Sequence, residues 1–169
     1  VVTGDTKVVP AGKGGGLYVT TAGLGCRVAP AALSPRAAKP GDAVIVSNSV
    51  GAHGIAVLAA RERLRAAGSI RSDLALLWPV CRDLLDLGPE LRFLRDATRG
   101  GLAAVVNEIA RGGGVGIEVR EQDIPVEPQV RAVAAVLGLD PVEIANEGVV
   151  VAVVGPGSAA AAVAALRRH

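Results

Sequence analysis

Apolar and polar residues follow two different periods along this chain, and they predict strands as well as helices. Short apolar runs rich in β-branched residues, at 43–47 and 149–154, are typical of buried strands, and residues 91–94 form a third short run. From Leu102 to Ile109 the apolar residues recur at i, i+3, i+4 and i+7, which is the spacing of one helical face. Strands and an amphipathic helix together indicate a chain that folds around a core.

Weaker patterns complete the expected fold. Further helices are predicted over 55–67, 76–87, 128–138 and 158–166, and further strands over 1–9, 17–25 and 115–119. The glycine-rich residues 12–16 lack the order of a phosphate loop and have no helix directly after them, so we expect a turn between strands. Helices and strands alternate without a GxGxxG motif or a strict βαβ period. The predicted fold class is therefore α+β, with helices on a mixed sheet.

The composition indicates which kinds of binding partner and which location to expect. The 169 residues carry a net charge of +2 with acids and bases interspersed, and they include one Trp, one Tyr and one Phe. A protein without a basic stripe or aromatic platforms is not expected to bind nucleic acid. The apolar stretch 149–166 is broken at Gly155–Gly157, so we expect no membrane span. Cys26 and Cys81 lack the spacing of a zinc site or a disulfide framework, which favours a cytoplasmic protein.

The clearest candidate for chemistry is the turn LRDATRGG before the helix at 102–109. Asp96 and Thr98 are residue types that cap helices, Arg99 is a cation, and Gly100 and Gly101 allow the backbone to approach a ligand closely. A strand, a glycine turn and a helix N-terminus are the usual setting for a phosphate. An ordinary capped turn between strand and helix is the alternative.

Two more charged positions are candidates. Glu147 lies between Asn146 and Gly148 at the entry of a buried strand, where a carboxylate partly removed from water could act as a general base. The alternative is a turn acid with its side chain in water. Lys7 beside Asp5 could bind phosphate or be a guarding charge on an edge strand. We expect His53 to cap or pack rather than to act as a base.

Several motifs together resemble one family. In this order they are VTGDTKVV, GDAVIVSNSVGAHGIAVLAARE, IRSD, LRDATRGGLAAVVNEIA, VGIEV, IPV and LGLDPVEIANEG. They are similar to the HypE family of hydrogenase maturation factors, which is related to aminoimidazole-ribonucleotide (AIR) synthetase. The resemblance implies that residues 1–28 are the end of an N-terminal ATP-binding, dimer-forming domain. It implies that residues 29–169 are most of an AIR-synthetase-like C-terminal domain.

The resemblance also implies a reaction. A carbamoyl group carried on a C-terminal cysteine would be dehydrated to thiocyanate at the expense of ATP with Mg²⁺, supplying the cyanide ligand of the iron in nickel–iron hydrogenase. Lys7 and Glu147 match family residues near the thiocarboxamide and would accept or stabilise protons. The implied residues for nucleotide phosphates or magnesium are Asp5, Asp96, Thr98, Arg99, Gly100 and Gly101. The implied partners are the carbamoyltransferase HypF, the HypC–HypD scaffold and a second copy of the full-length protein.

Some family features differ or lie outside this sequence. Ala97 and Ala52 stand where the family is expected to have Pro and Asp. The family's acidic N-terminal half and its terminal cysteine tail are not among these residues, so we expect the isolated chain to be inactive. Two alternatives stay open. One is another synthetase of the same superfamily, such as a selenophosphate or aminoimidazole-ribonucleotide synthetase. The other is a docking module without catalysis.

Overall fold

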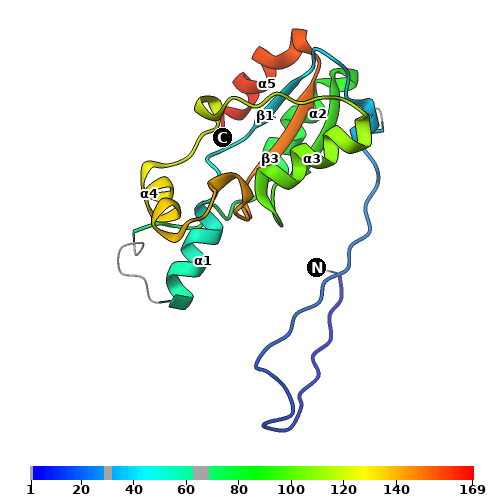
Figure 1. Cartoon of the computed structure of the whole chain (residues 1–169). Coiled ribbons are helices and arrows are strands. Elements are labelled where there is room, and N and C mark those ends of the chain that lie inside the picture. The colour runs from blue at the N-terminus through cyan, green and yellow to red at the C-terminus, as the bar shows by residue number, and fades with distance from the viewer. Residues whose placement is uncertain (1, 29–31, 63–68) are drawn as a thin grey trace.

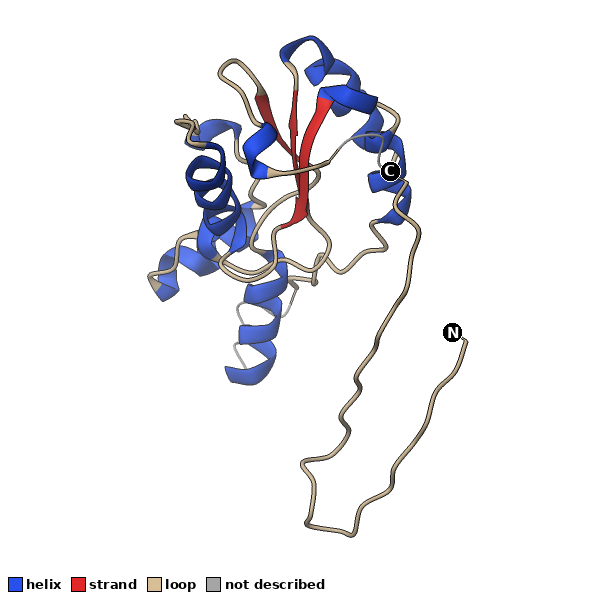
Figure 2. Cartoon of the chain, turned by 90° about the vertical axis from the view of Figure 1, so that its right-hand side faces the viewer, coloured by secondary structure: helices blue, strands red, loops and turns tan. Residues whose placement is uncertain are grey.

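A three-stranded antiparallel sheet forms the centre of the computed structural model, which describes residues 2–28, 32–62 and 69–169. The strands are β1 (Ala43–Val46), β2 (Leu91–Asp96) and β3 (Val150–Val154), and they lie in the order β1-β3-β2 (Figure 2). Both edge strands pair antiparallel with β3, in a register that places Ile45 and Leu94 opposite Ala152. All three predicted strand runs are confirmed, and the described strands are antiparallel rather than mixed.

Helices cover both faces of this sheet (Figure 1). On one face α3 (Gly101–Gly113) packs Leu102, Val105 and Ile109 against Val151 and Val153. On the other face α2 (Trp78–Leu85) and α5 (Ala159–Leu166) pack against Ala152 and Val154. Every residue of β3 is buried because the strand is central and covered twice, which explains its uninterrupted apolar sequence.

A second pair of helices forms its own small core. In α1 (Ala52–Glu62) and α4 (Pro128–Leu137), Ile55 and Ala59 pack against Val130 and Ala134. Within residues 32–62 and 69–169, five single-turn 3-10 helices connect the main elements, at Pro35–Ala37, Gly88–Glu90, Glu121–Asp123, Pro141–Glu143 and Pro156–Ser158. The α+β class is confirmed.

The predicted helices are present with shifted ends. The helix expected over 76–87 begins at Trp78, with Pro79 in its first turn, where a missing N–H group costs nothing. The helix expected to reach residue 67 is described as far as Glu62, and residues 63–68 lie outside the described part. In the part of the chain that the structure describes, no helix has the length and apolarity to cross a membrane.

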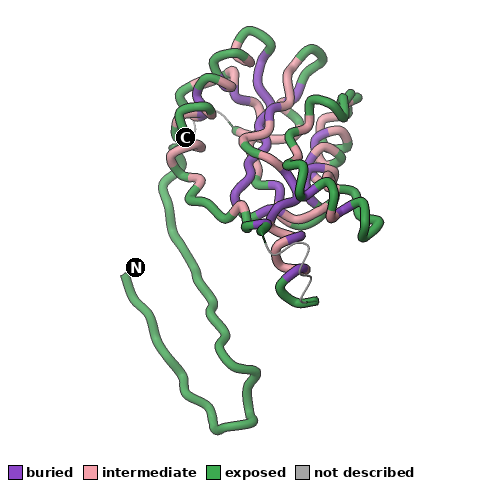
Figure 3. Tube along the Cα trace, turned by 90° about the vertical axis from the view of Figure 1, so that its left-hand side faces the viewer, coloured by how far each residue is buried: buried purple, intermediate pink, exposed green. Residues whose placement is uncertain are grey.

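Three strand predictions are wrong. Residues 2–28 form an exposed arm without a strand, called the N-terminal arm below, in which Leu17 and Leu24 are solvent-exposed (Figure 3). Residues 115–119 keep an alternating pattern of burial up to Glu118 but make no ladder with β1. The reason is the same in both segments: a strand is stable only beside a partner strand, and neither segment pairs with one.

Candidate functional site

Turns that are far apart in the sequence meet at one end of the sheet, where β2 ends and β3 begins. The N–H group of Ala97 donates to the Val149 carbonyl over 2.9 Å, and the N–H group of Asn146 donates to the Ala97 carbonyl over 3.1 Å. These bonds place the TRGG and ANEG motifs side by side. We call residues 51–54, 72–73, 96–101 and 144–148 the turn cluster.

Asn146 joins three of these turns through its side chain. Its amide is fully buried. The amide oxygen accepts the Gly51 N–H at 2.7 Å, and the amide nitrogen donates to the carbonyls of Ala97 at 2.8 Å and Ile144 at 3.1 Å. The structure thus uses Asn146 to hold the backbone, and its buried polar atoms are satisfied as buried amides require.

The first turn of α3 differs from the predicted cap. The N-cap is Gly100 in the left-handed conformation (φ 74°), and no side chain caps the helix, so Asp96 and Thr98 do not have the capping role that their residue types suggested. A β-carbon on Gly101 (φ 59°) would lie 2.5 Å from the carbonyl oxygens of Val142 and Ile144. Gly101 is therefore required for close approach to another part of the chain itself.

Glu147 lies in a small polar network with three other side chains. The Asp73 carboxylate accepts the N–H groups of Glu147 at 2.7 Å and Gly148 at 2.9 Å through one oxygen, and the His53 N–H at 3.0 Å through the other. The His53 ring lies with Nδ1 2.9 Å from Ser72 Oγ and Nε2 4.0 Å from Glu147 Oε1. The Glu147 side chain is 45% exposed and that of His53 is 25% exposed. The pair can therefore meet both a ligand and water.

Sequence reasoning missed the roles of Asp73 and Ser72. Both belong to the IRSD segment, which was visible as a polar break but carried no spacing that connects it to Glu147. His53 was expected to cap or pack. Its backbone does lie in the first turn of α1, but its ring also faces Glu147.

The predicted site residues fall into two groups in the structure. Thr98, Arg99, Gly100 and Gly101 lie in the turn cluster with Glu147, with Arg99 exposed. Lys7 and Asp5 lie in the N-terminal arm, which runs away from the folded body (Figure 1).

Asp96 ends β2 and is exposed. Burial raises the pKa of the Cys81 thiol on α2, and the negative charge of Asp96 raises it further. The charge of Asp96 therefore acts on Cys81 of α2.

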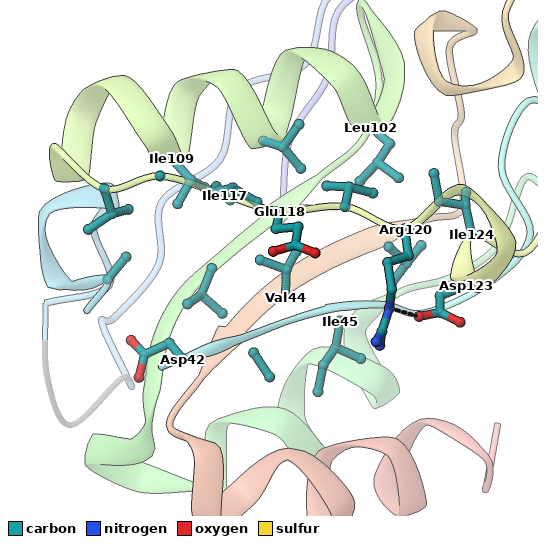
Figure 4. A pocket seen from close by; sticks show the side chains of 18 of the residues that line it. Asp42, Val44, Ile45, Leu102, Ile109, Ile117, Glu118, Arg120, Asp123 and Ile124 are labelled. Carbon is teal, nitrogen blue, oxygen red and sulfur yellow. Dashed lines mark hydrogen bonds and ion pairs between the residues drawn. The ribbon is translucent and has the colours of Figure 1, made fainter. Parts of the chain in front are cut away.

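A separate cavity lies away from the turn cluster. A space of about 780 Å³ opens between β1, α3 and residues 115–125, lined by apolar side chains such as Val44, Leu102 and Ile109 (Figure 4). Glu118 and the 2.6 Å ion pair between Arg120 and Asp123 also line it. None of the predicted site residues lines this cavity.

A more polar hollow of about 510 Å³ adjoins the turn cluster. Ser72 and Asp73 line it, together with Asn48, Ser49 and Glu127. Within the described ranges, no three His, Cys, Asp or Glu side chains are arranged to hold a metal ion. The hydroxyl, amide and carboxylate groups that line the hollow can donate and accept hydrogen bonds.

The sequence of this chain matches a known protein family. The family model for the C-terminal domain of AIR synthase related proteins matches residues 39–169. This chain belongs to that family. The match covers the sheet, all five α-helices named above and the whole turn cluster.

The similarity to HypE extends over every residue. The chain is 47% identical over 169 residues to the carbamoyl dehydratase HypE of Cupriavidus necator, covering 100% of this chain and 48% of that protein. It is 48% identical to HypE of Rhizobium leguminosarum bv. viciae, covering 49% of that protein. The chain therefore spans about half the length of the curated relatives it matches.

Solved structures agree with this similarity. A HypE–HypF complex superposes with a TM-score of 0.78 at 41% identity, over 80% of this chain and 44% of the matched chain. HypE in complex with ATP superposes with a TM-score of 0.76 at 42% identity, over 79% of this chain and 40% of that chain. The resemblance to the HypE family that the motifs predicted is confirmed.

Proposed function

We propose that this chain is the larger part of the C-terminal domain of an ATP-dependent carbamoyl dehydratase that acts in nickel–iron hydrogenase maturation. The supporting observation is that the chain matches HypE proteins along all of its residues, including the joined TRGG and ANEG turns. In domain terms, residues 1–28 would end an N-terminal ATP-binding domain and residues 29–169 would form the AIR-synthetase-like domain. The family model matches residues 39–169, which lie within the second of these segments.

The proposed reaction converts a carbamoyl group on a cysteine thiol into a thiocyanate. The carboxamide oxygen attacks the γ-phosphorus of ATP, an O–P bond forms, and ADP leaves. Two N–H protons are then removed, the C–O bond breaks, and phosphate leaves with the bonding electrons as the C≡N bond completes. A base near the nitrogen and positive groups near the phosphates are what this chemistry needs.

Residues of the turn cluster match these needs. Glu147 has a half-exposed side chain and is proposed as the base. Thr98, Arg99, Gly100 and Gly101 surround the N-terminus of α3, whose first N–H groups and dipole favour phosphate. Asp96 is proposed to lie near the nucleotide. Lys7 and Asp5 are proposed to act from the arm, and this requires the arm to reach the turn cluster in the full-length protein.

ATP is the proposed phosphate donor, in line with the solved HypE that binds it. Mg²⁺ is proposed by family resemblance to accompany the nucleotide phosphates. HypF is a proposed partner, because a similar HypE is known in complex with it. The HypC–HypD scaffold as acceptor, a homodimer and a cytoplasmic location complete the proposal by family resemblance.

The decisive experiment substitutes Glu147→Gln in the full-length protein. Because removing a general base typically lowers a rate by about 10²- to 10⁴-fold, we expect ATP-dependent thiocyanate formation to fall within that range. The matched control is Glu143→Gln, an exposed glutamate four positions earlier, which should leave turnover unchanged. Wild-type turnover in the Glu147 variant would refute the base assignment, and a wild-type protein that binds HypF without turnover would favour the docking role.

A further inference from the structure

The sheet has a free edge along β1. The strand order β1-β3-β2 gives β1 a partner on one side, and among residues 2–28, 32–62 and 69–169 no strand pairs with its other side. The Ser47 N–H group donates to the Val150 carbonyl at 3.0 Å, so by the alternation of an antiparallel ladder Ile45 also bonds towards β3. The N–H and carbonyl groups of Val44 and Val46 therefore point away from β3, along the free edge.

Apolar hollows lie on both sides of this edge. On the face covered by α3, Val44 and Leu102 line the cavity of about 780 Å³ (Figure 4). On the other face, Ala43 and Ile45 line a hollow of about 670 Å³ with Val163 of α5. Successive side chains of a strand point to opposite faces, so one more strand here would fill both hollows. The edge therefore suits an apolar strand that is covered on both faces, as β3 is.

The direction of the strands indicates which segment can reach this edge. β1 and β2 are parallel, since both are antiparallel to β3 between them, and their connection passes through α2 on one face. α5 follows β3 on the same face. Crossovers between parallel strands are right-handed in nearly all proteins. Because β3 runs opposite to β1, a right-handed crossover through α5 travels the opposite way across the sheet, towards β1. The place beside β3 is already filled by β1, so the next strand falls on the free edge.

We propose that the segment following position 169 in the full-length protein forms a fourth strand on the free edge, antiparallel to β1. This inference rests on the proposed function, in which a cysteine-bearing segment follows this chain. The curated relatives are about twice as long as the chain, which leaves residues for such a strand. Arg167, directly after α5, lines the same hollow as Ala43 and Ile45, so the chain leaves this helix beside the edge. The edge of β1 is thus the surface that holds the start of the cysteine-bearing segment on this domain.

The test is amide hydrogen exchange, measured at single residues by NMR, in the full-length protein and in the same protein ended after His169. The N–H groups of Val44 and Val46 should exchange at least about 100-fold more slowly in the full-length protein, because a paired strand must open before its amides exchange. Ile45 is the matched control. Its N–H group bonds towards β3 and should exchange slowly in both forms.

Equal exchange at Val44 and Val46 in the two forms would overturn the fourth strand. Exchange that is slow in the shortened protein would mean that another part of the protein covers the edge, or a second copy where the rate depends on protein concentration, and it would also overturn the proposal. If the shortened protein does not fold, the full-length protein decides alone. We then expect slow amides from Val44 to Val46, with nuclear Overhauser contacts from this strand to residues after 169. Fast amides on both sides of a slow Ile45, or contacts to any other segment, would overturn it.

Exchange and turnover can fail separately. Fast exchange at Val44 and Val46 with normal thiocyanate formation would remove the fourth strand and leave the proposed reaction standing. Slow exchange in a protein that forms no thiocyanate would do the reverse.

Discussion

The turn cluster and the N-terminal arm hold the two halves of one predicted site, and they are built in opposite ways. In the turn cluster, Glu147 is anchored by Asp73, 74 positions away in sequence, and Asn146 binds a group 95 positions away. In the arm, the one side-chain bond among the described residues joins Asp5 to its neighbour Thr6. Long-range bonds fix one half of the site, and only local bonds hold the other.

Because of this difference, the two regions are expected to contribute differently to stability and to catalysis. Residues of the turn cluster contribute to the stability of the fold as well as to the proposed chemistry, because buried or half-buried side chains hold the backbone groups there. Residues of the arm make no contribution to the core of this chain, so any role of Lys7 must appear in activity alone. Substitutions in the two regions should therefore have different effects on stability and activity.

The largest expected effect is that of Gly101→Ala. A β-carbon there would lie 2.5 Å from two carbonyl oxygens at a backbone φ of 59°, so the turn 141–144 must move and strain is added. We expect a loss of about 4 kcal/mol in the free energy of unfolding, measured by urea denaturation. Gly114→Ala is the control, since it has a φ of 65° with nothing within 4 Å of the new carbon. It should cost only about 1 kcal/mol.

Equal losses in the two glycine variants would mean that backbone strain alone explains Gly101, and that the approach of the two turns is looser than described.

The second-largest loss of stability is expected for Asn146→Ala. The substitution leaves the buried Gly51 N–H and the carbonyls of Ala97 and Ile144 without this partner. Since each buried polar group left unsatisfied costs about 1–3 kcal/mol, we expect a total loss of about 3 kcal/mol. The control is Asn107→Ala, whose exposed amide bonds only to Ala103 within its own helix. A stability change below about 1 kcal/mol for Asn146→Ala would show that the turns hold together without it.

The same contrast explains what the sequence could predict. The strand at 149–154 and the helix at 102–109 were predictable because burial leaves a period in the sequence itself. Strands were also predicted at 17–25 and 115–119 but are absent there, since β-branched residues favour a strand only where a partner strand exists. Glu147 was found by motif, whereas the anchoring by Asp73 depends on two turns meeting in space. No local spacing encodes that meeting.

A smaller effect is expected for Asp73→Asn. The amide nitrogen of Asn would face an N–H donor at one of the two positions where Asp73 accepts, so at least the His53 bond or the Glu147 and Gly148 bonds are lost. We expect a loss of about 1.5 kcal/mol in unfolding free energy. We also expect shifted backbone amide resonances at Glu147 and Gly148 in NMR spectra. Asp86→Asn, at the exposed C-cap of α2, should change neither. Unchanged amide resonances in Asp73→Asn would contradict the anchoring role.

Lys7→Ala is expected to have the smallest effect on stability. It should also show the clearest difference between an effect on stability and an effect on activity. Lys7 is exposed in an arm without a strand, so its loss should change the unfolding free energy of this chain by no more than about 0.3 kcal/mol. In the full-length protein the same substitution should reduce thiocyanate formation, because the proposal places Lys7 beside the thiocarboxamide. Lys13→Ala, in the glycine-rich turn of the same arm, is the control for loss of a positive charge. If Lys7→Ala retained full turnover, the arm would have no part in the chemistry. The proton transfers would then be left to Glu147 and its neighbours in the turn cluster.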